Sequence, residues 1–209
     1  MHPLSGSDSG KADGSIADPI ANRPARVATV ADLLQLVQGY PPHDAVEGQH
    51  RDALIALLEQ TGAPFSATQF DPGHVTASAC VVSRTGRRLL LIRHPTLGAW
   101  MQPGGHVEVD DPDLASAALR EALEETGLSP TPVTALPFDL DVHPIPARRG
   151  MPAHRHYDVR FLATVDGLPV ASTPEQIEWR WFDPAELPSL GIGPSVARMV
   201  EKARIAGLL

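Results

Sequence analysis

The chain has 209 residues, of which 43% are hydrophobic and 20% charged, a balance typical of a globular protein whose core is large enough to need no disulfide. Its formal net charge of −8 argues against a broad basic surface, so neither nucleic acid nor an anionic membrane is expected as a partner. The single cysteine, Cys80, excludes an internal disulfide and a multi-cysteine zinc cage, and its apolar neighbours predict a buried thiol.

Neither the N-terminal segment nor the apolar pattern predicts a membrane or secreted protein. No apolar stretch approaches the roughly 20 residues that span a bilayer, and no positive segment followed by an apolar one marks a secretory signal. We therefore expect a cytoplasmic protein. Residues 1–26 are rich in Gly, Ser, Asp, Ala and Pro without an apolar period, which predicts a flexible tail.

Residues 27–70 are predicted to form a helical extension ahead of the main domain. Thr29 and Asp32 resemble a capping box at the start of one helix, which should end near Gly39. A second helix is expected at 50–60, where leucines recur at helical spacing. Packing, dimerisation and covering a site all remain open as the purpose of these helices, so a homodimer is one open alternative.

The pattern changes at Val75 and predicts an α/β (α+β) domain over residues 71–209. The expected strands lie at 75–82, 89–93, 133–142, 156–165 and 177–182. A loop is expected at 98–111, followed by a strong helix at 112–126 and shorter helices at 184–187 and 194–205. Strands that flank one central helix, with further helices late in the chain, are typical of helices layered on a sheet.

Three carboxylates share one face of the central helix. Glu121, Glu124 and Glu125 stand at positions i, i+3 and i+4, where like charges repel by a few tenths of a kcal/mol per pair. A hard divalent cation such as Mg²⁺ or Mn²⁺ would turn that repulsion into attraction, because such ions prefer oxygen ligands. Taken alone, a Glu-rich helix is more often a solvated face. The opposite face, with Leu119 and Leu123, is expected to pack on the sheet.

The surrounding string favours the metal interpretation. It reads Gly104-Gly105-His106-Val107-Glu108, then Asp110-Asp111, then Arg120-Glu121-Ala122-Leu123-Glu124-Glu125-Thr126-Gly127-Leu128. From Gly105 onward this string resembles the Nudix box, which is a glycine, a spaced acid and then Arg-Glu-aliphatic-x-Glu-Glu-x-Gly-aliphatic. The loop carries one extra residue, since Asp111 keeps the family's spacing from Gly105 but is one position too far from Arg120. The outer acid is therefore Asp110, Asp111 or neither.

The resemblance implies a Nudix-type α/β/α sandwich with a mixed sheet, and a box that holds Mg²⁺ or Mn²⁺. By position, Glu124 and Glu125 match the principal metal ligands, and Glu121 matches a ligand or general base held by Arg120. Glu108 is either a ligand of a second metal or a solvated loop acid. Other positions are further candidates: Glu175 or Glu178 as an additional metal-binding acid, and Gly104 and Gly105 as contacts of the substrate. Arg93 is either a phosphate contact or a surface cap on its strand.

The strand expected at 156–165 carries polar side chains on one face. Four of them alternate and therefore point the same way: His154, His156, Asp158 and Arg160. Two interpretations stay open, a wall of the substrate cleft or an ordinary solvent-facing strand. We do not expect a zinc site there.

Together these patterns predict a Nudix pyrophosphohydrolase that cleaves a phosphoanhydride bond in a small nucleotide. The substrate class implied by the resemblance is a nucleoside diphosphate linked to another group, or a nucleoside triphosphate. The alternative is a Nudix-like domain that binds a nucleotide for regulation without turnover, and the three intact acids argue against it. A diphosphate isomerase on the same fold would need a reactive cysteine beside the metal, and Cys80 in a β run fits that poorly.

Overall fold

The computed structural model describes residues 28–148, 150–171 and 177–209. The tail predicted at 1–26 lies outside the described residues. Within the described ranges, no helix is long and apolar enough to cross a membrane.

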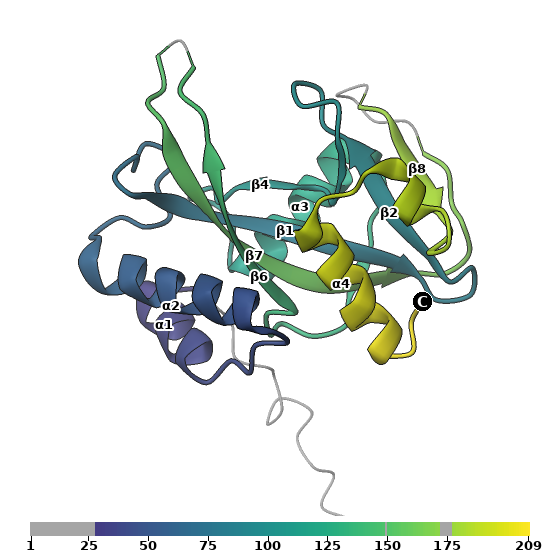
Figure 1. Cartoon of the computed structure of the whole chain (residues 1–209), viewed down its shortest axis with the longest axis horizontal. Helices are drawn as coiled ribbons and strands as arrows, with labels where there is room; N and C mark the ends of the chain where they lie inside the picture. Colours follow the sequence, from purple (N-terminus) through teal and green to yellow (C-terminus); the bar gives the residue numbers. More distant parts are fainter. Residues whose placement is uncertain (1–27, 149, 172–176) are drawn as a thin grey trace, which may run out of the picture.

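A single mixed sheet of eight strands organises the molecule (Figure 1). Its two long central strands run parallel and pair along their whole length, whereas the other pairs are antiparallel. The strands are β1 (Gly73–Ser83), β2 (Arg88–Arg93), β3 (Trp100–Met101), β4 (Gly104–His106), β5 (Thr131–Pro132), β6 (Asp139–Ile145), β7 (His154–Val165) and β8 (Trp179–Phe182). The central pair is β1 with β7, and β4 and β6 lie on its two sides.

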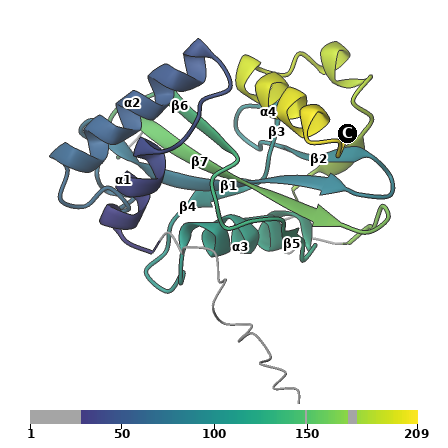
Figure 2. The same cartoon turned by 90° about the horizontal axis from the view of Figure 1, so that it is seen from below.

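Helices cover both faces of the sheet, which confirms the predicted α/β/α sandwich (Figure 2). Helix α3 (Leu114–Thr126) lies on one face, and α4 (Pro194–Ile205) lies on the opposite face. Helices α1 (Val30–Gln38) and α2 (Ala45–Gln60) sit at one end, beside β6. A 3-10 turn (Leu187–Leu190) replaces the short helix expected at 184–187.

The predicted helical extension shares the core of the main domain. Leu33 and Val37 of α1 and Leu54 and Leu57 of α2 are buried in the same apolar cluster as β1, β7 and α3. Burial of this kind is the main source of helix stability, because propensity alone rarely holds a short helix. Among the alternatives left open by the sequence, the structure therefore shows packing.

Local capping explains where the helices begin and end. The predicted Thr29–Asp32 capping box is present, with Asp32 N–H donating to Thr29 Oγ1 at 3.1 Å. Helix α2 begins five residues earlier than expected, because Asp44 caps it by accepting from the Glu47 N–H at 2.7 Å. Helix α3 ends at Gly127, whose φ of 72° is the left-handed conformation that favours glycine.

Two predicted elements in the sheet were misplaced. The stretch expected as a loop at 98–111 contains β3 and β4, and these strands are too short to show an apolar alternation. The strand expected at 133–142 is replaced by β5 and β6, which both pair with β7. In each case the register comes from a distant partner strand rather than from the local pattern.

The two faces of β1 differ in chemistry. Val75, Ala77, Ala79 and Val81 point into the core beneath α3, and Cys80 points into the core beneath α4. Burial raises the pKa of the Cys80 thiol to about 12, so the thiol is protonated and inert at pH 7, as expected. The other half of the α4 face is polar, and it begins with three buried side chains of β1: His74, Thr76 and Ser78.

Candidate active site

The strand β4, the loop after it and the helix α3 bring together the residues of the box. On β4, Gly105 pairs with Ala77 of β1, and α3 packs across both strands. A Cβ on Gly105 would lie 2.6 Å from Glu121 Oε1, and one on Gly104 would collide with the Ser78 side chain. Only glycine allows the Glu121 carboxylate to lie directly against the strand at this position.

One guanidinium gathers the acids of this site. Arg120 Nη1 donates to Glu121 Oε1 and to Glu124 Oε2, both at 3.0 Å, and it lies 3.8 Å from Glu108 Oε1. On its other edge, Nε and Nη2 donate to the two oxygens of Asp111, both at 3.0 Å. Such charge-assisted bonds fix the side-chain positions of all partners.

Of the two candidate outer acids, Asp111 has described contacts with the box residues. The extra loop residue does not displace it, since its carboxylate reaches Arg120 and also accepts from the Glu108 N–H at 2.8 Å. Burial alone would raise the pKa of Asp111, but the hydrogen bonds from Arg120 and from the Glu108 backbone lower it. The hydrogen bond from Arg120 to Asp111 in turn raises the pKa of Arg120.

The third glutamate of α3 takes a different direction. Glu125 is 9% exposed, and its Oε2 accepts from the Gly104 N–H at 3.0 Å. The Glu124 side chain is 43% exposed, and that of Glu121 is 16% exposed. The carboxylates of α3 therefore form a row that begins with Glu125 at strand β4 and ends with Glu124 at the surface. Their oxygens are hard donors that suit a hard divalent cation.

The helix face that supports these acids is narrower than expected. Ala118 and Ala122 are buried against the sheet, whereas Leu123 is 45% exposed, so its predicted packing on the sheet is wrong. Small residues let α3 approach β1 and β4 closely, which is what places Glu121 against Gly105.

Two predicted positions lie away from the box. Arg93 Nη1 pairs with Glu178 Oε2 at 3.2 Å, and both side chains are about half exposed. No described contact joins Arg93 to the acids of α3. Glu175 lies outside the described residues.

Asp158 and Arg160 are buried, so a solvent-facing strand is wrong for this part of β7. Arg160 is 1% exposed, and it pairs with Asp139 at 3.0 Å, Asp141 at 3.2 Å and Asp158 at 2.8 Å. Arg198 of α4 adds a second guanidinium at 2.9 Å from Asp139. Arg160 also contacts Ser195 of α4, so it joins the sheet to that helix, whereas the described partners of Asp158 outside β7 lie on β1 and at Gln102. Their contact with a substrate stays a prediction.

The sequence carried a signal for this network that the prediction missed. Asp139 and Asp141 alternate on β6, and Arg198 and Lys202 stand at i and i+4 on α4, so each pair shares a face. His154 and His156 lie at the other end of the same face of β7, beside His74 and away from the Arg160 network.

Comparison with known proteins agrees with this geometry. Residues 73–203 match the family model described as the NUDIX domain. The RNA pyrophosphohydrolase of Acidiphilium cryptum is 31% identical over 136 residues, which cover 58% of this chain and 82% of that protein. The RNA pyrophosphohydrolase of Dinoroseobacter shibae is 34% identical over 103 residues, which cover 44% of this chain and 64% of that protein.

Solved structures share the fold at low sequence identity. The Escherichia coli dihydroneopterin triphosphate pyrophosphohydrolase superposes with a TM-score of 0.52 at 17% identity, covering 63% of this chain and 95% of that one. The NUDIX domain of Shewanella oneidensis NrtR, solved with ADP-ribose, gives a TM-score of 0.52 at 18% identity, covering 72% and 96%. With the family model matched over more than half of its length, the chain belongs to the Nudix family of pyrophosphohydrolases.

Proposed function

We propose that the chain is a hydrolase, dependent on Mg²⁺ or Mn²⁺, that splits a phosphoanhydride bond in a nucleotide. The proposed substrate is a nucleoside diphosphate linked to another group, or a nucleoside triphosphate. The observation that carries the proposal is the cluster of acids around Arg120, set against Gly104 and Gly105 of β4.

The donor set fits a hard divalent cation. Four carboxylates meet on the guanidinium of Arg120, and carboxylate oxygens are the ligands that a hard divalent cation prefers. We propose Glu124 and Glu125 as the principal ligands, with Glu121 as a ligand or the general base, and Glu108 as a further ligand near the surface. When bound, Mg²⁺ or Mn²⁺ would offset the charge of the phosphate oxygens and lower the pKa of a coordinated water.

The residues of the chain supply position and proton transfer. In the hydrolysis, a water oxygen forms a bond to phosphorus, the bridging P–O bond breaks, and the water proton passes to a base. Arg120 holds the Glu121 and Glu124 carboxylates in fixed directions, which orders these groups before a substrate arrives. Glu125 is fixed separately by the Gly104 N–H.

The test is chromatographic separation of the products formed from a panel of nucleoside triphosphates, sugar nucleotides and dinucleotides, with Mg²⁺ or Mn²⁺ and with a chelator; cleavage gives a nucleoside mono- or diphosphate and a second phosphorylated product. We expect turnover that requires the metal and falls by about 10²–10⁴-fold in Glu124→Gln and Glu121→Gln. Glu59→Gln, an exposed glutamate of α2, is the matched control and should retain wild-type turnover. Equal turnover in Glu124→Gln and the control would reject the proposed site.

Two further ligands in the panel test the alternative substrates and the non-catalytic alternative. The relatives named RNA pyrophosphohydrolase make triphosphorylated RNA a necessary substrate to include, against the expectation from the net charge of −8. A nucleotide that binds with metal but is never hydrolysed would favour the regulatory, non-catalytic alternative. The NUDIX domain solved with ADP-ribose makes ADP-ribose the first ligand for that arm.

A further inference from the structure

Five histidines gather at the polar end of the sheet, close to the box but separate from its acids. Neighbouring rings lie 4.8–5.6 Å apart between centroids, and they come from four strands. The members are His74 on β1, His106 on β4, His143 on β6, and His154 and His156 on β7.

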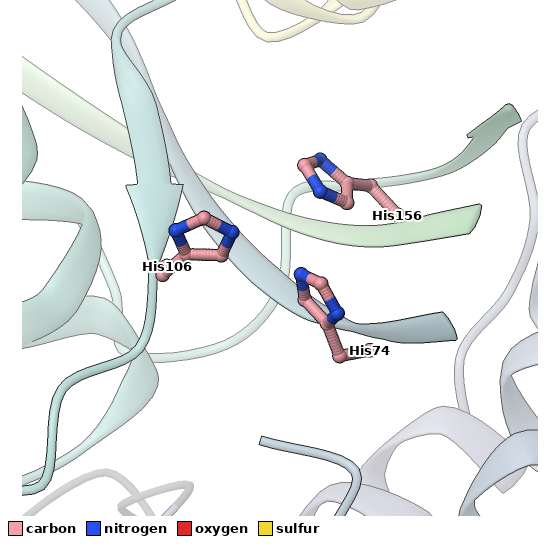
Figure 3. Close-up of side chains that lie close together, drawn as sticks. All are labelled: His74, His106 and His156. Atoms are coloured by element: carbon pink, nitrogen blue, oxygen red, sulfur yellow. The ribbon is translucent and has the colours of Figure 1, made fainter. Parts of the chain in front are cut away.

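The register of the sheet brings three of these side chains to one point. His74 pairs directly with His156 of β7, and His106 pairs with Thr76, two residues further along the same face of β1. The nitrogen atoms of His74, His106 and His156 that face one another all lie within 4.8 Å. Figure 3 shows one ring nitrogen of each residue turned toward the space between the three rings.

The hydrogen bonding of His74 leaves a lone pair aimed into this space. Its Nδ1 lies 3.0 Å from the Gln69 carbonyl oxygen, and a carbonyl only accepts, so Nδ1 carries the proton. The other nitrogen, Nε2, is therefore the acceptor. Within the described part of the chain Nε2 has no hydrogen-bond partner, although His74 is 1% exposed. A buried polar atom without a partner needs an explanation, and a bound metal ion is one that also accounts for the two rings facing it.

This arrangement is the one that metal-binding histidines use. A ligating histidine donates its second ring N–H to a carbonyl or carboxylate, which fixes the tautomer and the ring orientation. Burial also lowers the pKa of all three imidazoles, that of His156 to about 3, so each ring is neutral at pH 7. Phe70 packs edge-on against His154, and His154 stacks on His74, which supports the buried side of the group.

We propose that His74, His106 and His156 bind Zn²⁺ or a similar divalent transition metal, with an open coordination position toward solvent. Imidazole nitrogens suit these ions, whereas the carboxylates of α3 suit Mg²⁺ or Mn²⁺. With Zn–N bonds of about 2.0–2.1 Å, tetrahedral nitrogens stand about 3.4 Å apart, so the rings close by roughly an ångström on binding. His106 is exposed, which leaves a path for the ion and room for a fourth ligand.

This site was not expected from the sequence. Along the chain the three ligands are separated by 32 and 50 residues (74 to 106, and 106 to 156), and only His156 falls in the polar strand pattern. The pairing of β4, β1 and β7 makes them neighbours. His106 also directly follows Gly105, and its carbonyl accepts from Arg120 Nη2 at 2.9 Å, so the two proposed metal sites share strand β4.

The test measures metal binding directly, without turnover. Titration of the metal-free chain with Zn²⁺ in excess Mg²⁺, and with Co²⁺ followed by its visible absorption, should give one equivalent bound per chain. His106→Gln, at an exposed position that should not disturb folding, and His74→Gln should each bind about 100-fold more weakly or not at all. His43→Gln, an exposed histidine outside the group, and Glu124→Gln should bind as the wild type does.

Thermal unfolding gives a second measurement. Zn²⁺ should raise the melting temperature of the wild type and of Glu124→Gln, but not that of His106→Gln, because a ligand stabilises only a state that binds it. No Zn²⁺ binding to the wild type would overturn the proposal. Binding that persists in both histidine variants but disappears in Glu124→Gln would also overturn it, because the ion would then occupy the acids of α3.

Discussion

Two arginines, each surrounded by carboxylates, occupy opposite sides of the sheet. Arg160 is 1% exposed, and it meets Asp139, Asp141 and Asp158 beneath α4. Arg120 lies at the edge of α3, and its carboxylate partners range from buried to more than half exposed. The residue types are the same, but the surroundings are not.

The difference lies in how the acids are neutralised. The buried carboxylates of β6 are shared with a second guanidinium, Arg198, and with the Lys202 ammonium 3.3 Å from Asp139, so cations of the protein balance them. Arg120 instead contacts four carboxylates near solvent, and two of them, Glu108 and Glu124, are well exposed and can be reached by an ion from solution. Buried ion pairs cost most when one partner is lost, whereas exposed acids remain available for chemistry.

The largest expected effect comes from removing the buried guanidinium of Arg160. Arg160→Met should lower the free energy of unfolding by about 3–5 kcal/mol, because Asp158 would lose its guanidinium partner in the interior and Asp141 would lose one of its two. Urea unfolding followed by circular dichroism measures the change. A loss below about 1 kcal/mol would show that the network contributes little to stability.

The next largest expected effect is the pH dependence of stability caused by Glu47, a buried acid that also contacts Lys202. Burial alone would raise the pKa of Glu47, but Lys202, the Tyr40 hydroxyl and the His43 backbone N–H lower it to about 2. A carboxyl whose pKa is depressed on folding stabilises the protein above its unfolded pKa, near 4.5, and this contribution is lost as the pH falls toward 2.

We therefore expect the unfolding free energy to decline between pH 4.5 and 2, with on the order of 3 kcal/mol of that decline due to Glu47. Glu47→Gln should show a shallower decline over the same range, although it is less stable at pH 7. Melting temperatures measured at several pH values in both proteins test this. Parallel curves for the two proteins would contradict it.

The matching substitution of Arg120, whose carboxylate partners lie nearer to solvent, should affect turnover more than stability. Arg120→Met should lower turnover by about 10–100-fold, because Glu121 and Glu124 lose the donor that fixes them. Its stability should fall by less than that of Arg160→Met, since Glu108 and Glu124 reach solvent and only Asp111 among the four partners is as buried as the partners of Arg160. Arg84→Met, at an exposed pair with Asp166, is the control and should leave both quantities unchanged.

The smallest expected effect tests how closely Gly105 approaches Glu121, one of the acids around Arg120. Gly105→Ala would place a methyl 2.6 Å from Glu121 Oε1, and the flexible carboxylate would swing away while the fold is kept. Turnover should fall by about 10-fold, since displacement of a catalytic group by roughly an ångström is costly. Gly62→Ala, where nothing lies within 4 Å of the new methyl, serves as the control. Wild-type turnover in Gly105→Ala would contradict the close approach.

Features that depend on local chemistry were predictable from the sequence. The Thr29 cap, the Gly127 stop and helix α4 lie where the pattern placed them, because capping and helical periodicity act within a few residues. The spacing of Glu121, Glu124 and Glu125 likewise predicted that the acids share one helix face, and the longer string from Gly105 to Leu128 predicted the family. The start of α2 was missed although Asp44 and Glu47 carried a local signal.

Features that depend on pairing between distant strands were decided only by the tertiary structure. The residue pattern could not distinguish Asp158 and Arg160, which are buried, from the less buried His156, two and four residues away on the same face of β7. That distinction depends on where α4 ends along the sheet. The meeting of His74 with His106 likewise depends on the register of β4 against β1, which backbone hydrogen bonds set and side-chain periodicity does not encode.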